Sequence, residues 1–136
     1  VGIGRYDALN GLLLKGDGQG NFSPLSMQKS GIVFPGDGKS LVTLKASDGS
    51  LLVASGQNRG KLGLFRHEDQ IFSVDVGPFD HAAIIHLKNK QSYRHEIYYG
   101  NSFLSQSSRR LWLPVNTDKV EIIDYVGSQR EVVIPQ

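Results

Sequence analysis

Residues 98–114 read YYGNSFLSQSSRRLWLP, and this stretch decides how the second half of the chain is interpreted. Its last residues alternate, with Leu111 and Leu113 on one side of an extended strand and Arg110 and Trp112 on the other. Glycine and serine are turn formers, because glycine accepts unusual backbone angles and serine hydroxyls bond nearby backbone groups. The stretch therefore predicts a polar connection over residues 100–108, followed by a strand with one apolar face.

The same alternation extends on both sides of this stretch. A period of two indicates strands that turn one face to a core and the other to solvent, as in a β-sandwich. We therefore predict a small β-sandwich-type module over residues 70–136. The alternating positions are Phe72, Val74 and Val76, then Tyr93, His95, Ile97 and Tyr99, then Val120 and Ile122, and finally Val132 and Ile134.

The first half has a different pattern. Short apolar runs such as Leu12 to Leu14 and Leu51 to Val53 are separated by turns rich in glycine, aspartate and asparagine. Strands that are apolar on successive residues require burial on both faces, which a propeller blade provides. We predict a four-stranded, propeller-like antiparallel meander over residues 1–66, an all-β chain with essentially no helix, and a soft boundary in the polar segment 66–70.

Composition narrows the classes of partner. The chain has 136 residues, 39% of them hydrophobic, and 15 basic residues nearly balance 13 acidic ones. The only adjacent basic pair is Arg109 and Arg110, so we expect no nucleic-acid partner. The absence of cysteine excludes disulfides and thiolate chemistry. Apolar runs are far shorter than the roughly 20 residues that span a bilayer, so we expect no membrane insertion by this segment.

Three stretches of the first half carry a resemblance to a known family. LLLKGDGQGNFSPL (12–25), SGIVFPGDGKSLVTL (30–44) and LLVASGQNRGKLGLF (51–65) are similar to the last repeat of FG-GAP/VCBS-type β-propeller proteins. In the second half, residues 98–114 and VEIIDYVGSQREVVIP (120–135) resemble the ASPIC/UnbV module that follows such repeats, including in the cartilage acidic protein family. Together these stretches cover most of the chain.

The resemblance implies a location and a role. It implies a bacterial protein that is secreted or held in the cell envelope, and a non-catalytic, adhesion-like module that binds a glycan or protein partner. An alternative is an accessory module of a carbohydrate-active or other hydrolytic enzyme whose catalytic part lies elsewhere in the parent chain. The chain begins without methionine, so we expect a processed chain or a piece of a longer one. Blade faces left open in such a piece predict self-association.

One loop raises the question of calcium. Calcium-binding FG-GAP repeats carry a D-x-D-x-D-G loop, whereas KGDGQGN (15–21) has a single aspartate. Asp17 and Asn21, with Gln19, would supply one carboxylate and two amides, and calcium takes six to eight oxygen ligands. The same residues are typical of a tight turn, and the turn is the favoured interpretation.

Serines and histidines suggest two kinds of chemistry, both weakly. Four serines lie in residues 102–108, but there is no G-x-S-x-G motif, and hairpin chemistry explains the serines without catalysis. A two-residue turn at Asn89 and Lys90 would place His86 and His95 diagonally on one face of a hairpin, with no obvious third zinc ligand. No pair of carboxylates is marked for glycoside hydrolysis, so we predict that the chain is not an enzyme.

Aromatic and arginine residues provide the ligand-binding candidates. Arg94 and Tyr98 share one strand face by alternation, and Arg110 and Trp112 share another. These four residues form our predicted ligand-binding set, since exposed rings can stack on a flat ligand while arginine donates hydrogen bonds. The favoured alternative is that Trp112 and the tyrosines form the sandwich core, with arginine stems covering its rim.

Overall fold

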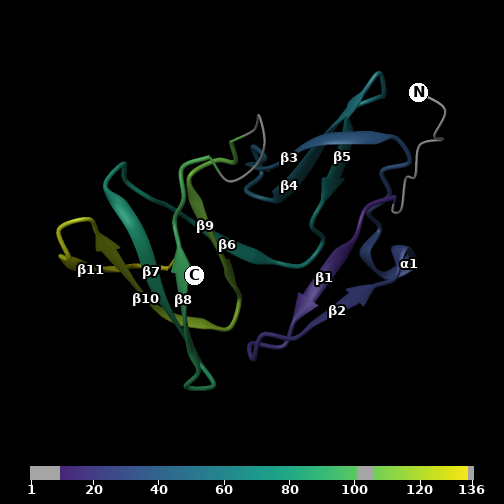
Figure 1. The fold of residues 1–136 in the computed structure, drawn as a ribbon. Helices are drawn as coiled ribbons and strands as arrows, with labels where there is room; N and C mark the ends of the chain where they lie inside the picture. The colour runs from purple at the N-terminus through teal and green to yellow at the C-terminus, as the bar shows by residue number, and fades with distance from the viewer. Residues whose placement is uncertain (1–9, 101–105, 135–136) are drawn as a thin grey trace.

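The computed structural model describes residues 10–100 and 106–134, and within these ranges the chain is all-β with antiparallel sheets (Figure 1). This confirms the predicted fold class. The one helix in the described ranges is a single turn, α1 (Met27–Ser30). The strands are β1 (Leu13–Gly16), β2 (Phe22–Leu25), β3 (Asp37–Lys45), β4 (Leu51–Asn58), β5 (Gly63–Arg66), β6 (Ile71–Asp75), β7 (Asp80–Leu87), β8 (Ser92–Glu96), β9 (Arg110–Pro114), β10 (Thr117–Asp124) and β11 (Gln129–Val132).

The second half forms two sheets that share one core. A four-stranded sheet has the order β11-β10-β7-β8, and β6 pairs with β9 in a separate two-stranded sheet. Side chains from both sheets meet in a single apolar cluster, which is what the period-two alternation predicts. Its fully buried members include Leu111 and Leu113 from β9, Ile85 from β7, and Val120 and Ile122 from β10.

The strands of the first half divide between two sheets. β3, β4 and β5 form a three-stranded meander, and β1 and β2 form a separate hairpin. The expectation that these apolar strands are buried on both faces is wrong for this chain. Leu13, Leu14 and Leu64 are exposed at 41%, 48% and 57%. The reason is that two small sheets provide too few neighbouring elements to cover both faces of every strand. The strands of the described residues form no closed propeller or barrel.

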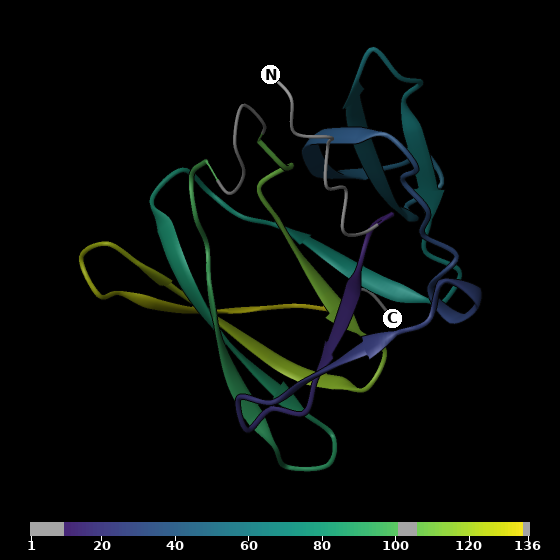
Figure 2. The same ribbon diagram turned by 45° about the vertical axis from the view of Figure 1, so that its right-hand side comes forward.

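The two halves meet at the edge of β3. The backbone N–H of Ser108 donates to the Thr43 carbonyl at 3.1 Å, and the Thr43 N–H donates to the Ser107 hydroxyl at 3.1 Å. A second connection is the covalent one, where residues 67–70 carry the chain from β5 to β6. The three-stranded meander and the sandwich lie side by side in both ribbon views, with the β1–β2 hairpin next to them (Figures 1 and 2).

The hairpin between β7 and β8 has a register that differs from the predicted one. Ile85 lies opposite Tyr93, and His86 lies opposite Ser92. The loop contains three residues rather than two, because Lys90 adopts a positive φ of 68° and closes a turn in which its N–H donates to the Leu87 carbonyl. This one-residue shift reverses the face of every side chain on β8 relative to β7.

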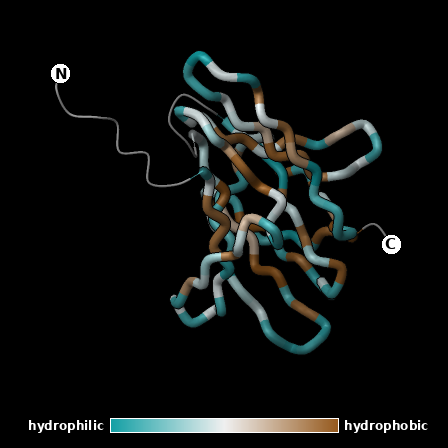
Figure 3. The backbone as a smooth tube through the Cα atoms, turned by 90° about the vertical axis from the view of Figure 1, so that its right-hand side faces the viewer, coloured by the Kyte–Doolittle hydropathy of each residue, from teal (hydrophilic) through white to brown (hydrophobic). Residues whose placement is uncertain are grey.

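The distribution of apolar and polar residues follows the pattern of strands and turns. Apolar residues run along the strands, and polar residues gather in the turns (Figure 3). Within the described residues, no helix has the length and apolar character needed to cross a membrane.

Candidate functional site

Three loops meet at one end of the sandwich. They connect β6 to β7 (76–79), β8 to β9 (97–109, described except for 101–105) and β10 to β11 (125–128). The antiparallel order β11-β10-β7-β8 brings them together. The last residues of β10, the first of β7 and the last of β8 lie side by side, so the loops leave the sheet at the same end of its strands. Loops that a rigid sandwich positions in this way are a frequent place for binding residues.

These loops expose large apolar side chains. We call this region the aromatic loop end and define it by Phe79, Tyr98, Tyr99, Tyr125 and Val126. The four rings are exposed at 73%, 63%, 56% and 63%, and Val126 at 86%. The opposite end of the sandwich has no aromatic residue in its two turns, which are Lys88 to Lys90 and residues 115–116. The gathering of rings is therefore particular to one end and is not a general property of the loops.

An ion pair with a buried carboxylate fixes the backbone beneath the rings. Asp80 is 3% exposed, and its two carboxylate oxygens accept hydrogen bonds from Arg130 at 2.6 and 2.5 Å. The Gly77 N–H donates to the same carboxylate at 2.6 Å. The hydrogen bonds from Arg130 hold the pKa of Asp80 below its ordinary value, so the carboxylate stays ionised. This pair connects the β6–β7 loop to β11.

Arg109 connects two of the loops. Its guanidinium donates to the carbonyls of Gly77, Asp80 and Tyr98 at 3.1, 2.9 and 3.3 Å. The same group lies over the Tyr99 ring, with its central carbon 3.7 Å from the ring centroid. Arg109 therefore fixes the β6–β7 loop against the β8–β9 loop, a role that sequence reasoning did not assign to either arginine of the pair.

Two of the exposed rings are held in place by their own contacts. The Tyr99 hydroxyl donates to the Pro78 carbonyl at 2.7 Å. Tyr125 stacks on His81 with ring centroids 5.1 Å apart, and its N–H donates to the Phe79 carbonyl at 3.1 Å. Each ring thus has one face backed by a protein group while more than half of its surface is open to solvent. Such rings offer a flat apolar face without losing side-chain freedom on binding.

The structure separates the predicted ligand-binding residues. Tyr98 belongs to the aromatic loop end, whereas Arg94 lies on β8 and forms an ion pair with Glu96 at 2.5 Å. Arg110 lies on β9, where it pairs with Asp75 and donates to the Ser73 hydroxyl at 3.1 Å. Arg110 and Trp112 lie on the same face of β9, whereas Tyr98 lies beyond the end of β8. Arg94 and Arg110 are each occupied by partners within the protein.

Trp112 lies neither in the apolar cluster nor fully at the surface. It lies opposite Ser73 on the face of β9 that points away from the apolar cluster, and it is partly buried there. Its Nε1 is buried and has no hydrogen-bond partner within the described residues. The favoured prediction that Trp112 and the tyrosines form the core is wrong for Trp112, Tyr98 and Tyr99, because Leu111 and Leu113 occupy the buried positions of their strand.

The candidate calcium loop has the contacts of a turn. Asp17 Oδ1 accepts from the N–H groups of Gln19 and Asn21 at 2.7 and 3.1 Å, and Asp17 Oδ2 accepts from the Asn21 amide at 2.7 Å. The hydrogen bond from the Asn21 side chain is the main reason that the pKa of Asp17 is lowered. Both carboxylate oxygens of Asp17 thus already accept hydrogen bonds from groups of their own loop. In the described ranges, no three histidine, aspartate or glutamate side chains are grouped to hold a metal ion.

The remaining candidates for chemistry are held apart or used structurally. His86 approaches Glu121 at 3.4 Å, whereas His95 is on the other face of the hairpin because of the three-residue turn. Burial lowers the pKa of His95, which favours its neutral form. Among the serines, Ser107 uses its hydroxyl to join the halves, and Ser102 and Ser105 lie outside the described residues.

Comparisons with known proteins found no relative for this chain. A scan against protein-family models gave no match, and searches of curated proteins and of solved structures gave none either. The resemblance to FG-GAP/VCBS repeats and to the ASPIC/UnbV module therefore stays a prediction from residues 12–65 and 98–135. The geometry of the loops and of the sandwich is what supports a function for this chain.

Proposed function

We propose that the chain is a non-catalytic binding module that engages its partner through the aromatic loop end. The observation that supports the proposal is the combination of four largely exposed rings with a backbone fixed from below by Asp80 and Arg109. Exposed apolar groups on a pre-organised frame bind at a small entropic cost, because little has to be ordered on contact. Aromatic residues and arginine are also the residue types that dominate binding energy at interfaces.

A glycan is the first candidate partner. Tyr99 is backed by a guanidinium and Tyr125 by an imidazole, so each turns its open face outward. A flat ring with one open face fits the apolar face of a sugar ring, and neighbouring hydroxyls and carbonyls can accept or donate hydrogen bonds. The resemblance to adhesion-like surface proteins agrees with this choice, as does its expected location outside the cell or in the cell envelope.

A protein partner is the second candidate. Phe79 and Val126 are more exposed than the tyrosines and carry no polar atom on their side chains, so they would contribute only by apolar burial. Such side chains at the tip of loops fit a hydrophobic recess on another protein. Either partner is compatible with a module of a surface protein or with an accessory module of a hydrolytic enzyme whose catalytic part lies elsewhere.

A glycan array with the whole chain tests the proposal. We expect a positive signal that is lost in the double variant Phe79→Ala/Tyr98→Ala, whose side chains make no hydrogen bond with a described residue. Phe22→Ala is the matched control, because Phe22 is 66% exposed on β2, outside the loop end. Circular dichroism establishes that each variant is folded. An equal loss of signal in the control, or unchanged binding by the double variant, would reject the loop end as the site.

The first half supports a separate proposal about self-association. β1 and β2 are exposed along almost their whole length, and Leu62 and Leu64 beside and within β5 are exposed at 69% and 57%. Exposed apolar strands associate with other apolar surfaces, because water is released on contact. We propose that these faces cause concentration-dependent association of the chain.

A further inference from the structure

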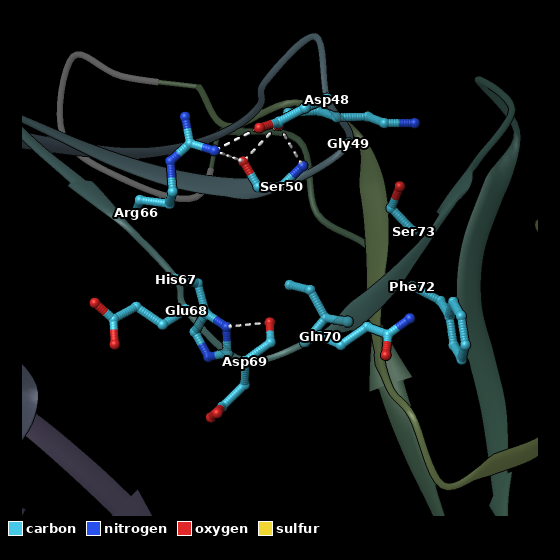
Figure 4. A pocket seen from close by; sticks show the side chains of 12 residues that line it. Asp48, Gly49, Ser50, Arg66, His67, Glu68, Asp69, Gln70, Phe72 and Ser73 are labelled. Carbon is cyan, nitrogen blue, oxygen red and sulfur yellow. Dashed lines mark hydrogen bonds and ion pairs between the residues drawn. The ribbon is translucent and has the colours of Figure 1, made fainter.

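An open pocket with charged and apolar lining lies where the two halves join, apart from the aromatic loop end. Its volume is about 670 Å³, within the range of roughly 300–1,000 Å³ that is usual for small-molecule sites. It is formed by the β3–β4 turn, the end of β5, the connection 67–70 and the start of β6 (Figure 4). The loop end follows the other terminus of β6, so the two regions are at opposite ends of that strand.

One side of this junction pocket is fixed by a network of hydrogen bonds. Arg66 donates to Asp48 and, at 3.0 Å, to the Ser50 hydroxyl (Figure 4). Asp48 Oδ1 accepts from the Ser50 hydroxyl at 2.7 Å and from the Ser50 N–H at 3.0 Å. The pKa of Asp48 is lowered mainly by the Ser50 hydrogen bonds and then by Arg66, so this wall carries a fixed charge pair at neutral pH.

The rest of the lining carries polar side chains with no partner among the described residues. The side chains of Lys45, Glu68 and Gln70 line the pocket and make no hydrogen bond or ion pair with any described residue. They offer an ammonium donor, a carboxylate acceptor, and an amide that both donates and accepts. Ile71 and Phe72 add apolar lining at the start of β6, although the Phe72 side chain also packs against the sandwich core.

The mixture of charges selects the class of ligand. Lys45 and Arg66 are cationic, whereas Asp48, Glu68 and Asp69 are anionic, so an anion meets carboxylates and a cation meets basic groups. A hydroxyl both donates and accepts hydrogen bonds, so a neutral polyhydroxylated molecule can satisfy donors and acceptors together. The ring of a sugar also has an apolar face that can lie against the apolar part of the lining.

We propose that the junction pocket binds one or two units of a neutral saccharide, with Glu68 accepting, Lys45 donating and Gln70 doing both. This site is independent of the aromatic loop end, and it stands whether the loop end binds a glycan or a protein. Because β3–β4, β5 and β6 all contribute side chains, a bound saccharide would also connect the two halves. Binding to the folded chain alone stabilises it, so the thermal midpoint rises with saccharide concentration.

The test follows backbone amide resonances of the whole chain during titration with neutral saccharides. Glucose, galactose, mannose, maltose and cellobiose are the probes, and glucuronate and glucosamine are their charged counterparts. At least one neutral probe should shift resonances in residues 45–50 and 66–73. Gln70→Ala should weaken that probe about fivefold, the equivalent of one lost hydrogen bond, and Glu68→Gln should weaken it as well. Phe22→Ala, on β2 and outside both regions, should leave the affinity unchanged.

Three results would overturn the proposal. They are no shift in the pocket with any neutral probe, equal affinity in Gln70→Ala and the unaltered chain, and tighter binding of glucuronate or glucosamine than of the neutral sugars. A loss of glycan-array binding in Phe79→Ala/Tyr98→Ala with retained pocket shifts would support both sites separately. Retained glycan-array binding in Phe79→Ala/Tyr98→Ala, together with retained pocket shifts, would reject the loop end and leave the junction pocket in place.

Discussion

Replacing Asp80 by asparagine tests whether the ion pair between the buried Asp80 carboxylate and Arg130 supports the aromatic loop end. Asp80→Asn keeps the size of the side chain but turns one acceptor oxygen into an amide donor. That donor would point at Arg130 or at the Gly77 N–H, both of which donate to the carboxylate in the native protein. The substitution therefore removes charge-assisted hydrogen bonds at a site that is 3% exposed.

The expected loss of stability follows from these contacts. A hydrogen bond to a charged group contributes about 1.5–3 kcal/mol, and a buried donor left without an acceptor costs about 1–3 kcal/mol. Half of the Arg130 side chain is exposed, so its guanidinium can bind water once the carboxylate is gone. The loss from the Arg130 hydrogen bonds therefore lies at the low end of these ranges. We expect the free energy of unfolding to fall by about 3 kcal/mol, a large part of the roughly 5–15 kcal/mol that stabilises a domain.

Urea unfolding monitored by fluorescence gives the measurement, because Trp112 is the single tryptophan and is partly buried. Asp75→Asn is the control, since Asp75 also pairs with an arginine but its side chain is 75% exposed, and we expect a change below about 0.5 kcal/mol. The lowered pKa of Asp80 sets the pH dependence. Its contribution is complete above its ordinary value of 3.8 and is lost as the pH falls through the lower folded value.

The two variants should therefore differ strongly at pH 7 and converge below about pH 4. The reasoning would be refuted if Asp80→Asn and Asp75→Asn were equally stable at pH 7. It would also be refuted if the effect of Asp80→Asn did not diminish in acid, because a loss of packing alone does not depend on the ionisation of the native carboxylate.

Three further predictions concern other parts of the chain. Arg109→Lys keeps the charge but loses the planar fork that reaches three carbonyls, so amide hydrogen exchange in residues 77–80 and 97–100 should accelerate about tenfold, and an unchanged rate would contradict the role of Arg109. Leu62→Ser/Leu64→Ser should lower the apparent mass in light scattering at high concentration, and a native chain that is monomeric throughout would reject self-association. Calcium at roughly 5 mM, above the ~0.1–1 mM typical of extracellular calcium modules, should not shift the resonances of residues 17–21, because loop donors occupy Asp17; a saturable shift lost in Asp17→Asn would establish calcium binding.

Local pattern predicted the strands and their faces well. The alternation in residues 110–113 placed Leu111 and Leu113 inside and Arg110 and Trp112 on the opposite face, because the period of two is a fixed property of extended backbone. The turn at Asp17 was predicted from residue type, since its hydrogen bonds are local. These features depend on residues that are close in the sequence.

Features that depend on neighbours in space were predicted poorly. The residue types of Asn89 and Lys90 favour a two-residue turn in the β7–β8 hairpin and give no sign that Lys90 takes a positive φ. The three-residue turn shifts the strand register by one residue, which places His86 and His95 on different faces. The first-half strands look suited to burial on both faces, yet burial depends on how many elements are available to cover them. Apolar runs alone do not contain that information.

The sequence by itself determined an all-β antiparallel chain, the faces of β6, β9 and β10 and the absence of thiol chemistry, because composition and period-two alternation act locally. Only the tertiary structure decided the aromatic loop end and the junction pocket. Phe79, Tyr98 and Tyr125 are separated by 19 and 27 residues in the sequence, and they meet because β10 pairs with β7, a strand to which it is not adjacent in the chain. That non-local pairing follows from burying Leu111, Leu113 and their partners in one core, which is a property of the whole fold.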